Sequence, residues 1–412
     1  MPAELDIAVV GGGIAGIAAA HYLSRTHRVT LFEAASLGGH ARSIRVDDGA
    51  GGHVAVDTAF LICNDDTYPL FMQLVEELGQ RSRVVRAEMS ACFSDEPRGL
   101  HYAMNRGIWA LFNGTRNIWR PAFYRMFAEV LVFRRRASAD LAAGRLGSIT
   151  LGEYLKAYSD LFRENFVLPL AACIWSLSPG NVWSYPAATI LRFFDNHRLL
   201  SGRSRYGWRT FEGTSGVYVD AFEKAFRGQL RLGTPVRQVQ RDDDGVTLHD
   251  GTAPLRFDKL VLATHADTAL SLLADPTPAE RDLLEPWRYQ PNTVVLHTDP
   301  RLMPPDRRLW ASWNYRATAR GPIISYHLNR VQALDTRRDL FLSLTDEEVA
   351  PEHLLDRQRL AHPVFDARAV ATQSKLGSLN GPRHTYYCGS YFGFGFHEDA
   401  VRSAHDVARL IG

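Results

Sequence analysis

The sequence predicts an α/β fold, α+β overall, in which a Rossmann-like nucleotide-binding domain is joined to a second domain of mixed sheet and helices. Three observations predict it. The glycine-rich turn GGGIAG at residues 11–16 directly follows an apolar run and opens an Ala-rich helical segment. Strand-like and helical segments alternate again between about 216 and 270. The region between them is different, because it is rich in Trp, Phe and Tyr and has mainly helical patterning.

The chain is long enough for two hydrophobic cores. It has 412 residues, 46% of them hydrophobic, and a single core stops growing at roughly 250 to 300 residues. The 47 Lys and Arg residues nearly balance the 45 Asp and Glu residues, for a net charge of +2. No strong field of one sign can attract nucleic acid, so we expect no nucleic-acid partner.

Cysteine usage and the N-terminal residues bear on the compartment. Cys63, Cys92, Cys173 and Cys388 lack the spacing of a zinc site or a disulfide scaffold. They indicate buried thiols in a reducing compartment, and we expect no metal. The N-terminal residues enter a strand without a signal-peptide pattern, so the expected location is the cytoplasm. No uncharged apolar stretch reaches the roughly 18 residues of a membrane-spanning helix, although a peripheral membrane contact stays open.

The first predicted unit is a βαβ motif made of strand DIAVV, helix IAGIAAAHYL and strand RVTLFE. Helices are then expected over PLFMQLVEELG and AFYRMFAEVLVFRRR, within a region of helical character from about 70 to 200. Next come the helix GVYVDAFEKAF, a hairpin turning at Asp244-Gly245 and the buried strand KLVLAT. Strand-like runs NTVVLHTD, PIISYHLN, LFLSL and YYCGSYF precede the last helix, EDAVRSAHDVARLI.

This order predicts that the nucleotide-binding domain is interrupted. We assign residues 1–85, 212–285 and 375–412 to it, and residues 86–211 and 286–374 to the substrate-binding domain.

The glycine motif carries a specific chemistry. Gly11, Gly13 and Gly16 have GxGxxG spacing between a strand and a helix. Side chains at the first two positions would block the turn and the approach of a pyrophosphate to the helix N-terminus, while Gly16 lets helix and strand pack closely. Glu33 ends the second strand, where a carboxylate can accept hydrogen bonds from ribose hydroxyls. The motif predicts a dinucleotide and leaves NAD and FAD open.

The stretch SLGGHARS, residues 36–43, continues the site. It resembles the second diglycine motif of the flavin-containing amine oxidase and phytoene desaturase group, usually GGRxxS/T. His40 stands at the place of the first Arg, and Arg42 follows two residues later. Which of the two neutralises the pyrophosphate is open at this point.

Five further segments, VDTAFLICNDDTYP, DKLVLATHADTAL, RYQPNTVVLHTD, WASWNY and GFHEDAV, are similar to a bacterial subset of FAD-dependent oxidoreductases in that group. The resemblance implies FAD as the cofactor. Members of the subset often accompany enzymes similar to cyclopropane-fatty-acid synthases, which implies a lipid acyl chain as one candidate substrate.

The resemblance also implies that the C-terminal segment returns to the flavin, with Gly389 and Ser390 at the place of the family's Gly-Asp or Gly-Glu. Covalent attachment in the group commonly uses a nearby Cys, and we expect none through Cys388. Together with the glycine motif, the expected FAD contacts are Gly11, Gly13, Ile14, Ala15, Gly16, Glu33, Ala34, Gly38, Gly39, His40, Ala41, Arg42, Ala59, Phe60, Leu61, Val236, Ala263, Thr264, Gly389, Ser390, Glu398, Asp399 and Val401.

The expected function is that of an FAD-dependent oxidoreductase moving hydride to or from a C–C or C–N bond of a small lipophilic substrate, by desaturation, saturation or isomerisation. Trp313, Tyr315 and Tyr326 are candidates for the substrate pocket. No catalytic base is assigned, because His265 and His397 are at least as well explained as shaping turns. A flavin amine oxidase is the alternative, disfavoured because no Lys has a convincing place near the flavin. A flavoprotein with structural FAD that acts as partner to another enzyme is the alternative of another class.

Overall fold

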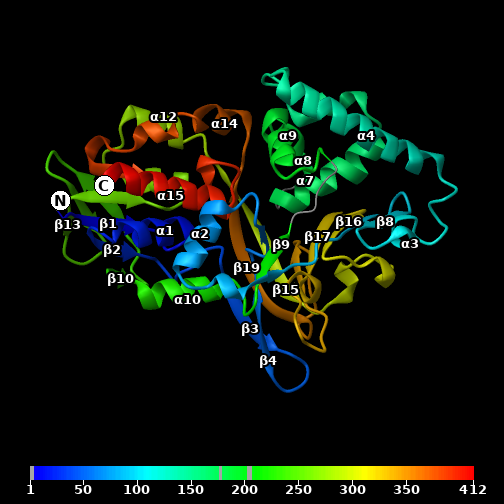
Figure 1. The fold of residues 1–412 in the computed structure, drawn as a ribbon, viewed down its shortest axis with the longest axis horizontal. Coiled ribbons are helices and arrows are strands. Elements are labelled where there is room, and N and C mark those ends of the chain that lie inside the picture. Colours follow the sequence, from blue (N-terminus) through cyan, green and yellow to red (C-terminus); the bar gives the residue numbers. More distant parts are fainter. Residues whose placement is uncertain (1–3, 176–178, 202–206) are drawn as a thin grey trace.

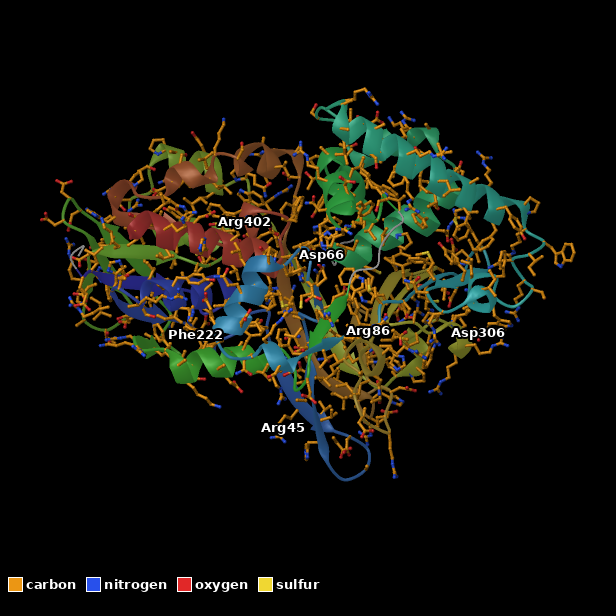
Figure 2. All side chains as sticks on the ribbon, in the orientation of Figure 1. Arg45, Asp66, Arg86, Phe222, Asp306 and Arg402 are labelled. Carbon is orange, nitrogen blue, oxygen red and sulfur yellow. The ribbon has the colours of Figure 1, made fainter. Side chains whose placement is uncertain are left out.

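The computed structural model of the protein describes residues 4–175, 179–201 and 207–412. Two parts lie side by side (Figure 1), with the described ends of the chain both in the part drawn on the left. That part is built on a parallel sheet, and the part on the right is built on a larger mixed sheet beneath a group of helices. Side chains of both parts extend into the space between them (Figure 2).

The parallel sheet gathers strands that lie far apart in the sequence. Its order is β10 (Gln229–Arg231), β2 (Arg28–Phe32), β1 (Asp6–Val10), β14 (Lys259–Leu262) and β20 (Thr385–Tyr387), all parallel. All five strands come from the three segments expected to form the nucleotide-binding domain. The carboxyl ends of these strands therefore meet at one edge of the sheet, where ligands bind in open α/β folds.

Alternating side chains of β1 enter two different cores, because successive residues of a strand point to opposite faces. Ile7 and Val9 pack in the core that contains α1 (Ile14–Leu23). Ala8 and Val10 pack with the residues of a three-stranded antiparallel sheet. That sheet consists of β11 (Gln238–Arg241), β12 (Val246–His249) and β13 (Leu255–Phe257). The predicted hairpin at Asp244-Gly245 is confirmed as its β11–β12 turn.

Helices cover the α1 face of the parallel sheet. The last helix, α15 (His397–Ile411), packs along α1, and α2 (Pro69–Glu77) packs on α15. A further helix, α10 (Gly216–Ala225), contacts α1 and carries Phe222 into this core (Figure 2). The remaining helices of this part are α11 (Ala266–Leu272), α12 (Pro278–Leu284) and α14 (Ala367–Gln373). The helices predicted over GVYVDAFEKAF and EDAVRSAHDVARLI are confirmed.

The second sheet has seven strands. In order they are β19 (Leu354–Pro363), β15 (Tyr289–His297), β18 (Phe341–Leu344), β17 (Gly321–His327), β16 (Trp313–Thr318), β7 (Ala91–Asp95) and β8 (Leu100–Met104). Neighbours are antiparallel except for β16 and β7, which are parallel. The hairpin β7–β8 corrects the prediction of helical character from about 70 to 200. It was hidden because its short strands become a sheet only by pairing with β16, more than 200 residues away.

Helices and small sheets complete the structure. Above the seven-stranded sheet lie α4 (Pro121–Ala142), α7 (Leu168–Trp175), α8 (Pro179–Ser184) and α9 (Ala187–Asn196) (Figure 1). Short helices α3 (Ile108–Leu111), α5 (Leu151–Tyr154), α6 (Asp160–Phe162) and α13 (Leu328–Val331) belong to the same part. The small sheets are β3 (Ser43–Asp47) with β4 (His53–Asp57), and β5 (Cys63–Asn64) with β9 (Trp208–Phe211) and β6 (Val84–Arg86). No helix among the described residues is long and apolar enough to cross a membrane.

A buried ion pair joins three elements of the nucleotide-binding part. Arg241 of β11 donates to Glu280 of α12, with Nη2 and Oε2 2.9 Å apart, and the Tyr387 hydroxyl of β20 donates to Oε1 at 2.6 Å. The Arg241 side chain has no exposed surface and that of Glu280 is 6% exposed. Burial raises the pKa of Glu280, but the hydrogen bonds from Arg241 and Tyr387 outweigh it and hold this pKa at about 2.

The substitution Glu280→Gln is expected to lower the free energy of unfolding by about 3 kcal/mol, because it removes the buried counter-charge of the Arg241 guanidinium and leaves only the part-exposed Asp275. Urea unfolding of both proteins measures this. The contribution of Glu280 should be present above its ordinary pKa and disappear as pH falls towards its folded-state value. The matched control is Glu347→Gln, whose partner Arg320 is largely exposed, and it should cost about 1 kcal/mol or less. Equal losses in the two variants would contradict the buried-pair assignment.

Candidate cofactor and substrate site

The site begins at the turn between β1 and α1. The N–H of Gly11 donates to the carbonyl of Phe32 at 2.8 Å, which ties the turn to the end of β2. The second glycine pair lies directly on this turn, since the N–H of Gly38 donates to the carbonyl of Gly12 at 2.9 Å and Gly13 forms an isolated bridge with Gly38. The two diglycine motifs thus form one continuous backbone surface at the N-terminus of α1.

Each glycine of the first motif is required for a different reason. A Cβ on Gly11, whose φ is +107°, would lie 2.8 Å from the carbonyl oxygen of Ala263, and a Cβ on Gly16 would lie 1.8 Å from that of Gly11. A Cβ on Gly13 would meet no protein atom within 4 Å and would enter the cavity. The open space at Gly13, beside the free N–H groups of the first helical turn, fits an anionic phosphate group.

Glu33 is held at the end of β2 by two backbone donors. Its Oε2 accepts from the N–H of Gly12 at 2.6 Å and its Oε1 accepts from the N–H of Ala35 at 2.8 Å. Each carboxylate oxygen keeps a further lone pair, and Glu33 lines the cavity. The arrangement fits the recognition of a ribose diol.

The segment after β4 forms another wall, anchored by Asp57. This buried carboxylate accepts from the hydroxyls of Ser43 at 2.7 Å and Ser215 at 2.6 Å and from the amide of Gln332 at 2.8 Å. Burial raises the pKa of Asp57 to about 6 against these hydrogen bonds, which lower it. Next along the chain, Phe60 stacks on His397 with ring centroids 3.6 Å apart. Asp57 thereby fixes the path of the chain past the cavity.

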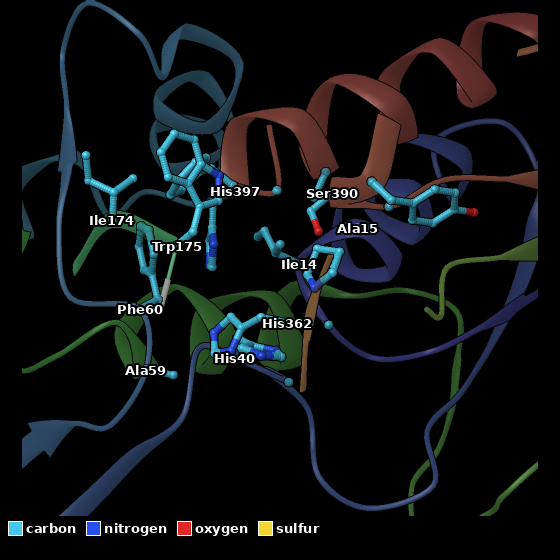
Figure 3. Close-up of a pocket in the computed structure, with 18 of the residues that line it drawn as sticks. Ile14, Ala15, His40, Ala59, Phe60, Ile174, Trp175, His362, Ser390 and His397 are labelled. Atoms are coloured by element: carbon cyan, nitrogen blue, oxygen red, sulfur yellow. The ribbon is translucent and has the colours of Figure 1, made fainter. Parts of the chain in front are cut away.

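A single cavity of about 500 Å³ joins these features (Figure 3). Of the expected cofactor contacts, the following line it: Gly11, Gly13, Ile14, Ala15, Glu33, Gly38, Gly39, His40, Ala59, Phe60, Leu61, Ala263, Thr264, Gly389 and Ser390. The structure thus brings together segments near residues 11–15, 33–40, 59–61, 263–264 and 389–390. The convergence of the C-terminal segment on the glycine turn agrees with the expected return to the flavin.

Eight expected contacts are not part of the lining: Gly16, Ala34, Ala41, Arg42, Val236, Glu398, Asp399 and Val401. Two of them use their carboxylates on backbone, because Glu398 accepts from the N–H of Phe71 at 2.9 Å and Asp399 accepts from that of Phe394 at 2.8 Å. The first turn of α15 still reaches the cavity, through His397 and Ala400.

Apolar side chains from the second part form the other end of the cavity. They are Leu170, Ile174 and Trp175 on α7, Phe193 on α9, Trp313 on β16 and Tyr326 on β17, and Phe396 before α15 joins them from the first part. Trp313 packs edge-on against Tyr326, whose hydroxyl donates to the carbonyl of Cys173 at 3.0 Å. The third substrate-pocket candidate, Tyr315, is buried and is not part of the lining. Ile174 on α7 and Phe193 on α9 were not predicted, because an apolar helix face has the same pattern whether it lines a cavity or packs in a core.

Five histidines line the cavity: His40, His197, His265, His362 and His397. Burial lowers the pKa of His40 to about 4 and those of His362 and His397 to about 3, so these imidazoles are neutral around pH 7. No lining residue that the structure describes is Lys or Arg, and Glu33 is the only carboxylate among them. Among all residues that the structure describes, no group of three or more His, Cys, Asp or Glu residues is arranged to hold a metal ion.

Comparisons with known proteins agree with this geometry. The family model for flavin containing amine oxidoreductases matches residues 14–412. Cyclohexylamine oxidase from Brevibacterium oxydans IH-35A has a similar structure, with a TM-score of 0.72, 16% identity and coverage of 99% of both chains. The fatty acid isomerase from P. acnes that produces CLA has a TM-score of 0.66, 16% identity and coverage of 98% of both chains. A search of curated proteins found no match to this sequence.

The two glycines with opposite surroundings give a matched pair of variants. Gly16→Val should destabilise the protein even without flavin, because its Cβ would overlap the Gly11 carbonyl oxygen. Gly13→Val should leave the flavin-free protein as stable as wild type but reduce the bound flavin about tenfold or more, because its side chain enters the cavity. Flavin absorbance per protein and thermal unfolding of flavin-free samples measure the two effects. Equal destabilisation in both variants would show that Gly13 is also packed.

The flavin is expected to be bound without a covalent link. Cys388 is fully buried and is not part of the cavity lining, and burial raises the pKa of its thiol to about 12. It is therefore held as an unreactive thiol rather than a thiolate. Acid precipitation should release all of the flavin into the supernatant. Flavin that stays with the wild-type pellet, and is lost from the pellet of Cys388→Ala, would contradict this expectation.

Proposed function

This chain belongs to the flavin containing amine oxidoreductases, and we propose that it moves hydride to or from a C–C bond of a lipophilic substrate, with a fatty acyl chain as one candidate. The coarser function follows from the family: the protein is an FAD-dependent oxidoreductase. The residues at the glycine turn fit FAD, since Glu33 is placed for a ribose and Gly13 leaves room for a diphosphate.

The observation that carries the proposal is the composition of the substrate end of the cavity. Aromatic and aliphatic side chains from α7, α9, β16 and β17 line it, and Glu33, the only carboxylate of the described lining, lies at the glycine turn of β1 and α1. A cationic substrate would be desolvated there without a counter-charge, which is costly. An apolar chain fits such a surface because its burial is favourable in proportion to the area removed from water.

FAD, when bound, accepts or donates the hydride. The side chains of this protein position the substrate and exclude water. The apolar surface made by Trp175, Phe193 and Phe396 keeps water from the reacting bond, which protects a reduced cofactor from side reactions. The N-terminus of α15 reaches the cavity through His397 and Ala400, where its backbone dipole favours negative charge.

A flavin amine oxidase is the second candidate. Cyclohexylamine oxidase and the fatty acid isomerase are each 16% identical to this chain, so their likeness concerns the fold and does not choose between their substrates. The described lining contains no Lys, which agrees with the sequence-based argument against an amine oxidase. A partner role with structural FAD remains the alternative of another class. The cytoplasmic location and the peripheral membrane contact stay predictions from the sequence.

Anaerobic mixing of the yellow protein with candidate substrates tests the proposal. Unsaturated acyl lipids or fatty acids should bleach the flavin absorbance, whereas short charged amines should not. An isomerisation returns the flavin to its starting state, so products are also analysed by mass spectrometry and chromatography. Rapid bleaching by amines alone would establish the amine oxidase instead, and a flavin left unchanged by every class, with no product formed, would favour the partner role.

The variant Trp313→Ala tests the assignment of the substrate end. The Trp313 side chain lines the cavity and its Nε1 has no hydrogen-bond partner among the described residues. Its loss should slow flavin reduction or product formation about tenfold or more while the flavin content stays unchanged. The matched control Tyr315→Phe, on the same strand but outside the lining, should react at the wild-type rate. A Trp313→Ala protein that is about 3 to 5 kcal/mol less stable but reacts normally when folded would instead place Trp313 in the core.

A further inference from the structure

The cavity presents no permanent positive charge to the diphosphate of FAD. None of its lining residues that the structure describes is Lys or Arg. The free N–H groups of α1 supply only the partial charge of a helix N-terminus. A dinucleotide bound at the glycine turn would therefore carry more negative charge than the folded protein offsets in its cofactor-free form.

The arginine nearest in sequence to the second glycine pair has another partner. Nη1 of Arg42 donates to Oδ2 of Asp356 at 2.7 Å and to the hydroxyl of Thr58 at 3.3 Å. Arg42 is not part of the lining, whereas His40 is. The ion pair joins the segment after β2 to β19 and makes Arg42 a link between the two parts of the molecule.

Three imidazoles line the cavity together with the glycine turn instead. His40 follows Gly39, where a Cβ would lie 3.1 Å from the Cα of Gly13. His265 lies two residues after Ala263, whose carbonyl faces Gly11. The ring centroid of His40 lies 6.2 Å from that of His265 and 5.2 Å from that of His362. Figure 3 shows His40 and His362 beside one another, below Ile14 of the first turn of α1 in this view.

The rings differ in the nitrogen that each can offer to a proton or an anion. Nε2 of His40 is buried without a hydrogen-bond partner among the described residues. Nδ1 of His362 accepts from the amide of Asn292 at 2.9 Å, so the proton of the neutral ring is on Nε2, which can donate to an anion without a further proton. His265 stacks face to face on Tyr289 with ring centroids 4.0 Å apart, a contact that does not involve the lone pairs of its nitrogens. The titratable groups that interact with the cluster are Asp267, which raises the pKa of His265, and His397, whose pKa is lowered by His40. Glu33 is the only carboxylate of the described lining.

We propose that the cluster of His40, His265 and His362 is the counter-charge of the FAD diphosphate, with His40 protonated from solvent when FAD binds. The chemistry balances as an association: one solvent proton and FAD join the protein, a new N–H bond forms on an imidazole, and nothing is oxidised. We expect only one of the three rings to be protonated, because a second positive charge would repel the first. The inference rests on FAD as the cofactor and is independent of which substrate the cavity accepts.

Because FAD binding is linked to proton uptake, the direction in which FAD affinity changes with pH is fixed. The free protein holds neutral imidazoles, with burial and the neighbouring His265 lowering the pKa of His40 to about 4. The diphosphate raises that pKa in the complex, so a proton is taken up at every pH between the two values. FAD affinity should therefore fall as pH rises through this window, by up to about tenfold per pH unit for one proton, and become constant above it.

The test measures FAD binding rather than turnover. Holoprotein is dialysed to equilibrium at several pH values from about pH 6 to about pH 9, where the diphosphate itself keeps its charge, and the Kd is obtained from retained flavin. Wild type should bind FAD progressively more weakly as pH rises. His40→Gln should match wild type at the alkaline end but lack the tightening at the acidic end, whereas a structural role would weaken binding equally at every pH.

Further variants complete the design. His40→Arg should bind tightly at every pH, because its cation does not titrate. His53→Gln, an exposed substitution on β4, should keep the wild-type profile. A wild-type Kd that does not change with pH would overturn the proposal, as would a wild-type slope that persists when all three clustered histidines are replaced by Gln. If a variant fails to fold, calorimetric proton uptake by wild type in two buffers with different ionisation heats decides, and zero uptake overturns the proposal.

Discussion

The contact between α1 and the turn that precedes it is the constraint on which the rest of the site depends. The backbone at Gly16 lies so close to the carbonyl of Gly11 that no side chain fits between them. This closeness points the free N–H groups of α1 at the carboxyl edge of the parallel sheet. The second glycine pair, Glu33 and the end of β14 all take their positions from that turn, through the bond from Gly38 to Gly12, the bond from Gly12 to Glu33 and the approach of Ala263 to Gly11.

The cofactor end of the site was predictable because its chemistry is local. A GxGxxG turn requires glycine for reasons of backbone space, and Glu33 follows it at the distance of one βαβ unit, so both are visible in a short window. Most of the nucleotide-binding segments were also predicted, since each strand carries its own apolar pattern. The β7–β8 hairpin was not predicted, because its short strands are stabilised by pairing with β16.

The substrate end could not be predicted in the same way. Ile174 and Phe193 have the pattern of core residues, and only the packing of α7 and α9 over the sheet turns them towards a cavity. The roles of His40 and Arg42 depend on Asp356, a residue more than 300 positions away that pairs with Arg42. Trp313 and Tyr315 lie two positions apart on one strand, yet Trp313 lines the cavity and Tyr315 is buried outside the lining. The sequence pattern alone does not distinguish these two positions. Tertiary contacts make these assignments, and no local pattern carries them.

The order of strands in the parallel sheet has a consequence for folding during synthesis on the ribosome. The central strand β1 is made before the other strands of this sheet, β14 about 250 residues later, and β20 and then α15 after them. Until they emerge, β14 is an open edge and the apolar face of α1 that α15 covers is exposed to water. A nascent chain therefore exposes apolar surface and an unpaired strand edge for a long part of its synthesis. Chaperones that bind such surface would act before the cofactor can enter.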